Sequence, residues 1–438
     1  MNWPGADRAM RWVVAVACLA LVIAPAARGA DEETATTGSA AAPGVVSSEP
    51  LLMAGLDRSG FGQWMTQNRI NAFGWVEGSY NFNFQNPSPR LNVGHLFEVQ
   101  DDDFVINQLE LNVERLVTPS RDAFDVGGRI DLLYGSDARF IHSSGMFTGS
   151  FPDPQYQFDI PQLYVDVAVP VGNGLRLRLG KFEFFKFTDP NASPVFSHTF
   201  FYDASGESNN SRLSSSLVGA SLPFTLTGIT AAYQFNSQLN VEVGIGRGYD
   251  QTFTDNNSAV DGFGRVNWDL PGQTQASFAL ISGPEISADE SHYRTSCDLG
   301  IVHAVSENFL ILFDACFGEQ ARGQALFVPG TGLVAIGGNA RWYGANATAV
   351  YRINRRISVA GRVEWYRDEE GFTTGLGSAN LYEVTAGLTI MPFPDNRVGR
   401  GLKIRPEIRY DWIDAHSAIA GLIPNHQWIA GVDLIYDF

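Results

Sequence analysis

The chain ends with the stretch WIAGVDLIYDF, residues 428–438. Every second side chain of this stretch is apolar, whereas the positions between them include Gly431, Asp433 and Asp437. Because successive side chains of a β-strand point to opposite faces, the alternation predicts a strand with one apolar face and one polar face. Such a strand fits the wall of a membrane barrel or the edge of a water-soluble sandwich, and the rest of the chain decides between them.

The same alternation recurs from Arg69 to the C-terminus. In residues 402–412 apolar and charged side chains alternate without a break, and in residues 104–116 Val105 and Leu109 are expected on the face opposite Gln108. The strands predicted from this pattern are 70–84, 104–116, 124–134, 160–169, 175–184, 224–235, 239–249, 260–269, 274–283, 292–305, 308–318, 340–353, 357–368, 380–390, 402–412 and 427–438. Sixteen strands are preferred. Counts of 14 or 18 stay open, because the connection 391–401 follows an even-numbered strand but is longer than most other connections in that position.

Short and long connections alternate between these strands. The segments after even-numbered strands are mostly short, as at 170–174, 236–238 and 354–356. The long segments after odd-numbered strands are 85–103, 135–159, 185–223, 319–339 and 413–426. Short periplasmic turns and long external loops are typical of outer-membrane barrels. The sequence therefore predicts an all-β fold, a transmembrane antiparallel β-barrel over residues 69–438.

Residues 1–30 have the features of a secretory signal peptide. Arg8 and Arg11 precede an apolar run over 12–24, and small residues follow up to Ala30. This run is shorter than the roughly 20 apolar residues of a spanning helix, and no later segment is longer, so strands must cross any membrane that holds the chain. Residues 31–68 are expected to form a flexible leader with a short periplasmic helix near its end.

The composition fits a wall that faces lipid on one side and water on the other. Mean hydropathy is −0.07, as expected when each strand averages an apolar face and a polar face. The net charge of −17 excludes a nucleic-acid-binding protein of the ordinary type, because such proteins neutralise phosphates with Lys and Arg. An acidic surface is compatible with divalent cations and lipopolysaccharide.

Cys297 and Cys316 lie on two predicted neighbouring strands. One register places Asp298 opposite Asp314 on the inner face and puts the cysteines on opposite faces of the sheet. Another register aligns the cysteines but turns an aspartate toward lipid, which is unfavourable. We prefer the first register, and whether the cysteines form a disulfide stays open.

Short motifs occur along the chain in a familiar order. They are Gly74-Trp75-Val76-Glu77-Gly78, Asn86-Pro87, Asp131 to Ala138, Pro161 to Val165, Gly180-Lys181-Phe182, Asn210-Ser211-Arg212, and Gly248-Tyr249-Asp250 with Asp255-Asn256-Asn257. Together they resemble the putative β-barrel porin-2 (OmpL-like) family of outer-membrane proteins over most of the mature chain. One motif departs, because Leu213 and Ser214 stand where the family has an aromatic residue. The resemblance implies a barrel with a pore and brings no catalytic residues.

The terminal strand also resembles the closing strand of bacterial outer-membrane barrels, in which the last aromatic residue is read by the barrel-assembly machinery. Phe438 is the expected contact for that partner. The expected location is the bacterial outer membrane, reached by export through the periplasm. Lipid, lipopolysaccharide and small polar solutes are the other expected partners. The oligomeric state stays open, with a homotrimer as one option because general porins are often trimers.

Charged residues at inward positions are the candidate pore lining, because charge facing lipid is costly whereas charge facing lumen water is not. The eight basic candidates are Arg129, Arg176, Arg178, Arg265, Arg362, Lys403, Arg405 and Arg409. The thirteen acidic candidates are Glu77, Glu110, Glu114, Asp125, Asp131, Asp166, Glu242, Asp261, Glu364, Glu383, Glu407, Asp411 and Asp433. Because acids outnumber bases we expect a weak cation preference, unless the two sets pair into salt bridges that leave selectivity unchanged.

The connection 185–223 is the longest and follows the fifth predicted strand. In sixteen-stranded general porins the third external loop folds inward, and by analogy at the level of the fold this loop forms a constriction. Asp189, Asp203 and Glu207 would be its acids, close to two arginines of the candidate lining.

No group of residues makes a convincing catalytic, cofactor or metal site. His142 and Ser143 are adjacent in a loop, and adjacent residues seldom form a base and its nucleophile. Asp101 to Asp103, and Asp250 with Asp255, lack the spacing of an EF-hand calcium loop and are expected to be solvated. We expect neither catalysis nor a bound cofactor.

The preferred hypothesis is an outer-membrane porin through which small hydrophilic solutes diffuse passively. The alternative is a narrow or plugged barrel that acts as a structural or adhesive surface protein. A third hypothesis is an outer-membrane hydrolase that uses a loop. The identity of the solute stays open.

Overall fold

The computed structural model describes residues 50–88, 90–95, 97, 99–147, 153–184, 195–196, 201–202, 214, 216–271, 273–328, 332–335, 337–416 and 424–438. All of them belong to one compact unit, Ala42–Phe438. The predicted signal peptide and the first part of the predicted leader lie outside the described residues.

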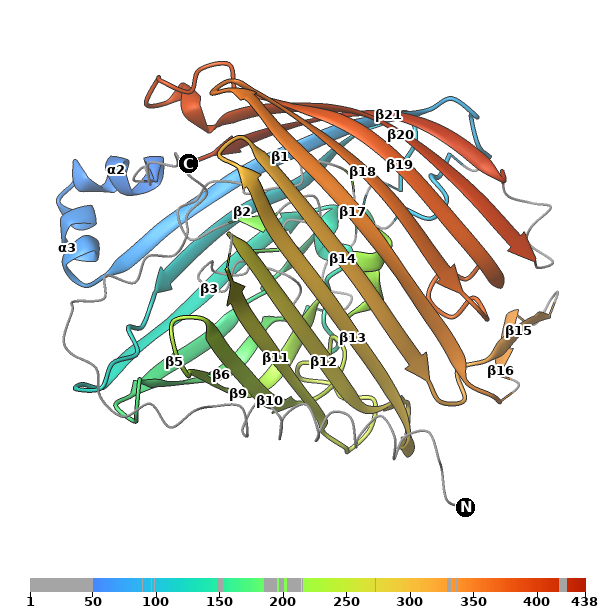
Figure 1. Ribbon diagram of the computed structural model, residues 1–438, viewed down its shortest axis with the longest axis horizontal. Helices are drawn as coiled ribbons and strands as arrows, with labels where there is room; N and C mark the ends of the chain where they lie inside the picture. Colours follow the sequence, from blue (N-terminus) through green and yellow to red (C-terminus); the bar gives the residue numbers. More distant parts are fainter. Residues whose placement is uncertain are drawn as a thin grey trace. The chain divides into compact units, whose positions relative to one another are not determined.

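Sixteen antiparallel strands form a closed barrel within this part of the chain (Figure 1). Each follows its neighbour in sequence, and β1 pairs with β21 from Trp75↔Asp437 to Asn83↔Ile429, which closes the sheet. The barrel strands are β1 Ile70–Asn83, β2 Asp103–Arg115, β3 Asp125–Gly135, β5 Leu163–Val169, β6 Leu175–Glu183, β9 Thr225–Gln234, β10 Leu239–Gly246, β11 Asp261–Leu270, β12 Thr274–Ile286, β13 Asp289–Ser306, β14 Phe309–Gln320, β17 Ala340–Asn354, β18 Ile357–Asp368, β19 Ser378–Ile390, β20 Leu402–His416 and β21 His426–Asp437. The predicted barrel and its preferred count of strands are confirmed.

Short elements decorate the connections. The strand β4 Gln157–Asp159 pairs with β3, and two hairpins form separate sheets: β7 Val195–Phe196 with β8 Phe201–Tyr202, and β15 Ala325–Val328 with β16 Gly332–Ala335. Three 3₁₀ turns are η1 Asp137–Arg139, η2 Val218–Ser221 and η3 Gly399–Gly401. The last of these lies in the long turn 391–401, which joins β19 to β20 without an additional strand.

The faces of the strands have the polarity of a membrane barrel. In β18, Arg362 and Glu364 are each 5% exposed, whereas Val363 between them is 55% exposed. A water-soluble sandwich would bury the valine and expose the charges, because burial of apolar area drives its folding. The reversed pattern is expected when the outer face contacts lipid and the inner face lines a polar interior. The sandwich alternative is therefore excluded.

Two short helices precede the barrel, α2 Leu51–Asp57 and α3 Phe61–Gln67. Met53 and Met65 pack against Ala72 of β1, which is 4% exposed although it lies on the same face as the exposed Val76. The helix pair thus covers the outer face of the barrel near the start of β1. No helix among the described residues is long and apolar enough to span a membrane.

The predicted register of β13 and β14 is wrong by two residues. Asp298 lies opposite Cys316 and not opposite Asp314, because a two-residue turn closes the hairpin between Ser306 and Phe309. The predicted faces are still correct, since a shift of two residues preserves the alternation. Cys316 points inward and is buried, Cys297 is partly exposed, and both cysteines are free thiols.

We therefore expect two free thiols in the mature protein purified without a reductant, because the third cysteine, Cys18, lies in the expected signal peptide. A disulfide requires Cβ atoms about 3.5–4.5 Å apart, which side chains on opposite faces of neighbouring strands do not reach. The check is the mass gained on maleimide labelling after denaturation, with and without prior reduction. Equal labelling is the expected result, and labelling that depends on reduction would mean that the register is wrong. The variant Cys297→Ala should lose one of the two labels.

Candidate functional site

The inner wall of the barrel carries a network of ion pairs. The register creates it, because Asp166 lies directly opposite Arg178 and Asp433 lies directly opposite Arg405. The pairs are Arg129 with Glu114 (3.1 Å) and Asp131 (2.6 Å), Arg178 with Asp166 (2.8 Å), Arg176 and Arg265 with Glu242 (3.1 and 3.4 Å), Arg362 with Glu383 (2.7 Å), Arg405 with Asp433 (2.6 Å) and Glu77 (3.2 Å), Arg409 with Asp411 (2.7 Å), and Lys403 with Asp437. Each of the eight basic candidates for the lining is therefore in contact with a carboxylate.

The segment between β6 and β9 reaches across the lumen. Glu364 of β18 accepts hydrogen bonds from Ser216 Oγ (2.7 Å) and from the backbone N–H groups of Leu217 (3.2 Å) and Val218 (2.7 Å). In a barrel of sixteen strands, β18 is the eighth strand after β6 and hence lies on the opposite wall. The loop is held there because one carboxylate satisfies three donors at the start of η2.

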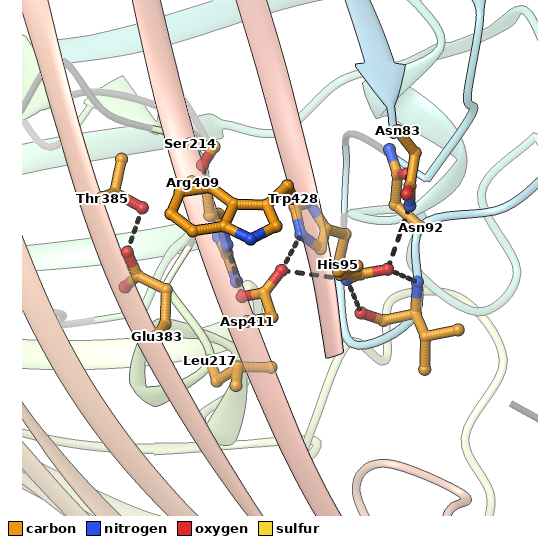
Figure 2. A network of polar contacts seen from close by, with 12 residues as sticks. Asn83, Asn92, His95, Ser214, Leu217, Glu383, Thr385, Arg409, Asp411 and Trp428 are labelled. Carbon is orange, nitrogen blue, oxygen red and sulfur yellow. Dashed lines mark hydrogen bonds and ion pairs between the residues drawn. The ribbon is translucent and has the colours of Figure 1, made fainter. Parts of the chain in front are cut away.

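Apolar and polar contacts extend this attachment. Val218 is fully buried in a cluster that includes Trp342 and Tyr366 of the facing wall. The backbone N–H of Ser214 donates to Glu407 at 2.7 Å, and Arg409 donates to Ser214 Oγ at 3.2 Å. The end of this loop is thus fixed to β17, β18 and β20. Ser214 and Arg409 of this attachment are shown in Figure 2.

The connection between β1 and β2 also enters the lumen. His95 Nε2 lies 3.0 Å from Asp411 Oδ2, and both side chains are nearly inaccessible. Gln427 of β21 donates to Asp411 (2.9 Å) and to the carbonyl of Val93 (2.7 Å). Asp411 therefore joins this first loop to Arg409, which in turn contacts the loop that crosses from β6 (Figure 2).

The acidic cluster at the end of the first loop has structural roles. Asp101 accepts the backbone N–H of Asn83 at 2.6 Å. Hydrogen bonds from the hydroxyl of Tyr80 and from Arg90 lower the pKa of Asp102 below its ordinary value. These contacts fix the loop to β1. Asp101 is buried and therefore not solvated as predicted, whereas Asp102 and Asp103 are exposed, as predicted.

A β-bulge in β2 holds the connection between β3 and β5. The register of β1 and β2 shifts at Gly78, so that Asn107 and Gln108 both point inward. Their amide groups donate to Asp137 of η1 at 3.4 and 2.9 Å. The bulge also turns Val105 inward, so the prediction that Val105 lies on the face opposite Gln108 is wrong.

Three loops meet in one aromatic cluster. The ring of Phe97 from the first loop lies 5.3 Å from that of Phe140 and 5.8 Å from that of Phe224, which precedes β9. Aromatic rings at such distances and near-perpendicular angles stabilise each other beyond their burial. The three loops thus pack against one another at this cluster.

The family model described as "Putative beta-barrel porin-2, OmpL-like" matches residues 69–184 and 206–438, which is more than half of the chain. The chain belongs to this family. It is accordingly a porin of the bacterial outer membrane, a barrel for the passive diffusion of small solutes.

Solved porins share the fold of this family member. The outer membrane channel DcaP of Acinetobacter baumannii matches with 12% identity and a TM-score of 0.51, over 84% of this chain and 97% of that one. The anion-selective porin from Comamonas acidovorans has 11% identity and a TM-score of 0.50, over 84% and 99%. Pseudomonas putida OprB has 10% identity and a TM-score of 0.50, over 87% and 97%. At these identities the likeness concerns the fold alone, and no curated protein sequence matches the chain.

The structure places the predicted site residues of this porin in different environments. The eight basic candidates and eight of the thirteen acidic candidates lie on the inner wall in the ion pairs above. Of the other five acids, Glu364 and Glu407 accept hydrogen bonds from the loop after β6, Asp125 pairs with Arg69 and Arg115, and Glu110 and Asp261 are buried. Asp189, Asp203 and Glu207 lie outside the described residues. Ser143 is fully buried, with its Oγ 2.9 Å from Thr225 Oγ1. Asp250 accepts the backbone N–H groups of Phe224 and Thr225, so it is a structural residue and is not simply solvated as predicted.

Some residues of the site were missed because they are uncharged or lie in loops. Ser214, Ser216, His95 and Gln427 form the contacts that hold the loops, and no sequence pattern singled them out. The bulge at Asn107 had a visible signal, because two consecutive polar residues interrupt an otherwise alternating strand. No group of three or more His, Cys, Asp or Glu residues suited to a metal ion occurs in the described part of the chain.

Proposed function

We propose that this porin passes small hydrophilic solutes through a narrow aqueous path between the inward loops and the barrel wall, with a weak preference for cations. The observation that carries the proposal is the attachment of residues 214 and 216–218 to the wall opposite β6. A sixteen-stranded barrel leaves an aqueous lumen unless loops fill it. A segment across that lumen would limit the size of solute that passes, and we assign the constriction to the loop 185–223.

The charge of the wall supports the preference for cations. Each of the eight basic candidates is matched by a carboxylate, and the thirteen acids leave a negative balance. A ring of carboxylates raises the local concentration of cations in a pore. The Comamonas acidovorans porin of the same fold is anion-selective, which indicates that the fold alone does not determine the preference.

Planar-bilayer recording of the purified, folded protein tests this function. Stepwise current with a cut-off in a series of sugars of increasing size is the expected result. In a KCl gradient the reversal potential should have the sign of a weakly K⁺-preferring pore. Folded protein that gives no steps would contradict the porin proposal, and a Cl⁻-directed potential would contradict the preference.

Neutralising one acid of the wall should weaken the preference. Glu407→Gln retains the size of the side chain but removes a charge near Ser214, so the reversal potential should move toward zero. Glu307→Gln is the matched control, because Glu307 is exposed in the turn between β13 and β14. The two variants are compared in the same KCl gradient. An equal shift in both, or no shift in Glu407→Gln, would show that the lining does not set selectivity.

A plugged barrel that acts as a structural or adhesive surface protein is the second candidate. The packed aromatic cluster of three loops favours it, because such packing narrows the lumen. The same recordings separate the two candidates. The hydrolase hypothesis has less support, since the hydroxyl of Ser143 is buried against Thr225, and we propose that the chain is not an enzyme.

Other partners follow from the sequence. We propose that residues 1–30 direct export, that Phe438 is read by the barrel-assembly machinery, and that exposed carboxylates of this acidic chain meet lipopolysaccharide through divalent cations. We also propose a homotrimer, because general porins are often trimers. Gel mobility of the membrane-extracted protein before and after heating would measure the oligomeric state.

A further inference from the structure

A small, partly open cavity lies where the crossing loop meets the wall near the barrel closure. Its volume is about 20 Å³, and its lining includes Glu77, Asn107, Ser214, Arg405, Glu407 and Asp433. These residues come from β1, β2, β20 and β21 and from the loop after β6. Space of this size holds roughly one water-sized group.

The lining has more negative than positive charge. Arg405 donates twice to Asp433, at 2.6 Å each, and once to Glu77 at 3.2 Å. Glu407 accepts the backbone N–H of Ser214 at 2.7 Å. Three carboxylates and one guanidinium thus give a formal balance of −2, which favours a cationic group over a neutral or anionic one.

Asn107 adds an acceptor that no described residue satisfies. This side chain is 1% exposed, lines the cavity, and owes its inward direction to the bulge in β2. Its Nδ2 donates to Asp137, whereas its Oδ1 has no hydrogen-bond donor in the described part of the chain. A buried acceptor without a donor is unfavourable, so a ligand that donates hydrogen bonds would stabilise it.

We propose that this cavity binds the ammonium group of small amine solutes on their way through the pore. An ammonium group has three donors, a positive charge and the size of a water molecule, whereas a guanidinium is larger and planar. The inference rests on the proposed function, because the amine reaches the cavity only if the lumen conducts.

Block of K⁺ current by amines in planar bilayers tests the inference. Ethylammonium chloride is compared with tetramethylammonium chloride, which has the same charge but no donors, and with ethanol, which has no charge. Ethylammonium should block at a concentration several-fold lower than tetramethylammonium, and ethanol should not block.

Two variants alter the cavity without changing its charge. In Gly431→Ala the added Cβ would lie 2.6 Å from Asn81 Oδ1 and 3.5 Å from Glu407 Cγ, so it occupies part of the cavity. Asn107→Leu removes the acceptor together with the Nδ2 donor to Asp137, just as the control below removes the Nδ2 donor to Asn240. The control is Asn267→Leu on β11, a buried inward asparagine whose Oδ1 also has no donor among the described residues but which is not in the cavity lining.

Either cavity variant that folds should lose the difference between ethylammonium and tetramethylammonium, while its KCl reversal potential stays that of the unmodified protein. The control should retain the difference. Equal block by the two cations, or a difference preserved in the cavity variants, overturns the inference and leaves the proposed function intact. Absence of any K⁺ conductance in folded protein overturns both.

Discussion

Replacing residues 185–221 with a short glycine–serine linker is expected to raise the single-channel conductance several-fold. The described end of this segment is attached to the opposite wall through Glu364 and Glu407, so its removal would leave the lumen open at that level. The lumen of a sixteen-stranded barrel is wide enough for an aqueous channel once it is free of loops. Conductance in planar bilayers and the cut-off for sugars are the measurements.

The control removes residues 325–335, which form the separate hairpin of β15 and β16. After this deletion the single-channel conductance should stay within the experimental scatter of the values measured for the unmodified protein. If the loop replacement leaves both conductance and cut-off unchanged in a folded barrel, the constriction must be assigned to another loop.

Arg129→Ala is expected to lower the free energy of unfolding by about 3–5 kcal/mol, the usual cost of leaving buried charge uncompensated. The Arg129 side chain is inaccessible, and it donates to Glu114 (3.1 Å), Asp131 (2.6 Å) and Asn112 (3.1 Å). Asp131 is also fully buried, so its carboxylate would lose its ion pair without gaining water. Urea titration in lipid or detergent, followed by tryptophan fluorescence, measures the change.

Arg355→Ala is the control for this variant. Arg355 forms an ion pair with Asp395 at 2.8 Å, but the two side chains are 77% and 64% exposed. Exposed ion pairs contribute roughly 0–1 kcal/mol, so the control should unfold almost as the unmodified protein does. Comparable losses in the two variants would mean that the inner ion pairs do not support the barrel.

The strands could be predicted from the sequence, because each alternation reports one physical fact, namely which side chains face lipid. All sixteen predicted strands are present, with ends that differ by a few residues, such as 402–412 against Leu402–His416. The alternation shows which face of the sheet each side chain is on, but not which residue of the neighbouring strand lies opposite. A shift of the register by two residues preserves the alternation. This is why the faces of Cys297 and Cys316 were correct while their register was wrong.

The inner site could be predicted only in part. Charge at inward positions identified the arginines and carboxylates of the wall, because their energetic preference for the lumen is strong. The loops carry no comparable signal, and neutral residues such as Ser216 and Gln427 gain their role from distant partners. The bulge that turns Val105 and Asn107 inward left a signal in the two consecutive polar residues Asn107 and Gln108, but its place in the sheet depends on the pairing with β1.

A cross-link between residues 216 and 346 tests most directly whether the loop lies across the lumen. Asn346 of β17 donates to Ser216 Oγ at 3.1 Å, so Ser216→Cys and Asn346→Cys place two thiols in contact, with Cys297 and Cys316 replaced by Ala. A short bifunctional thiol reagent should join them in the folded, membrane-inserted protein and leave the conductance unchanged. Failure to cross-link in a folded barrel, or closure of the pore on cross-linking, would contradict the account.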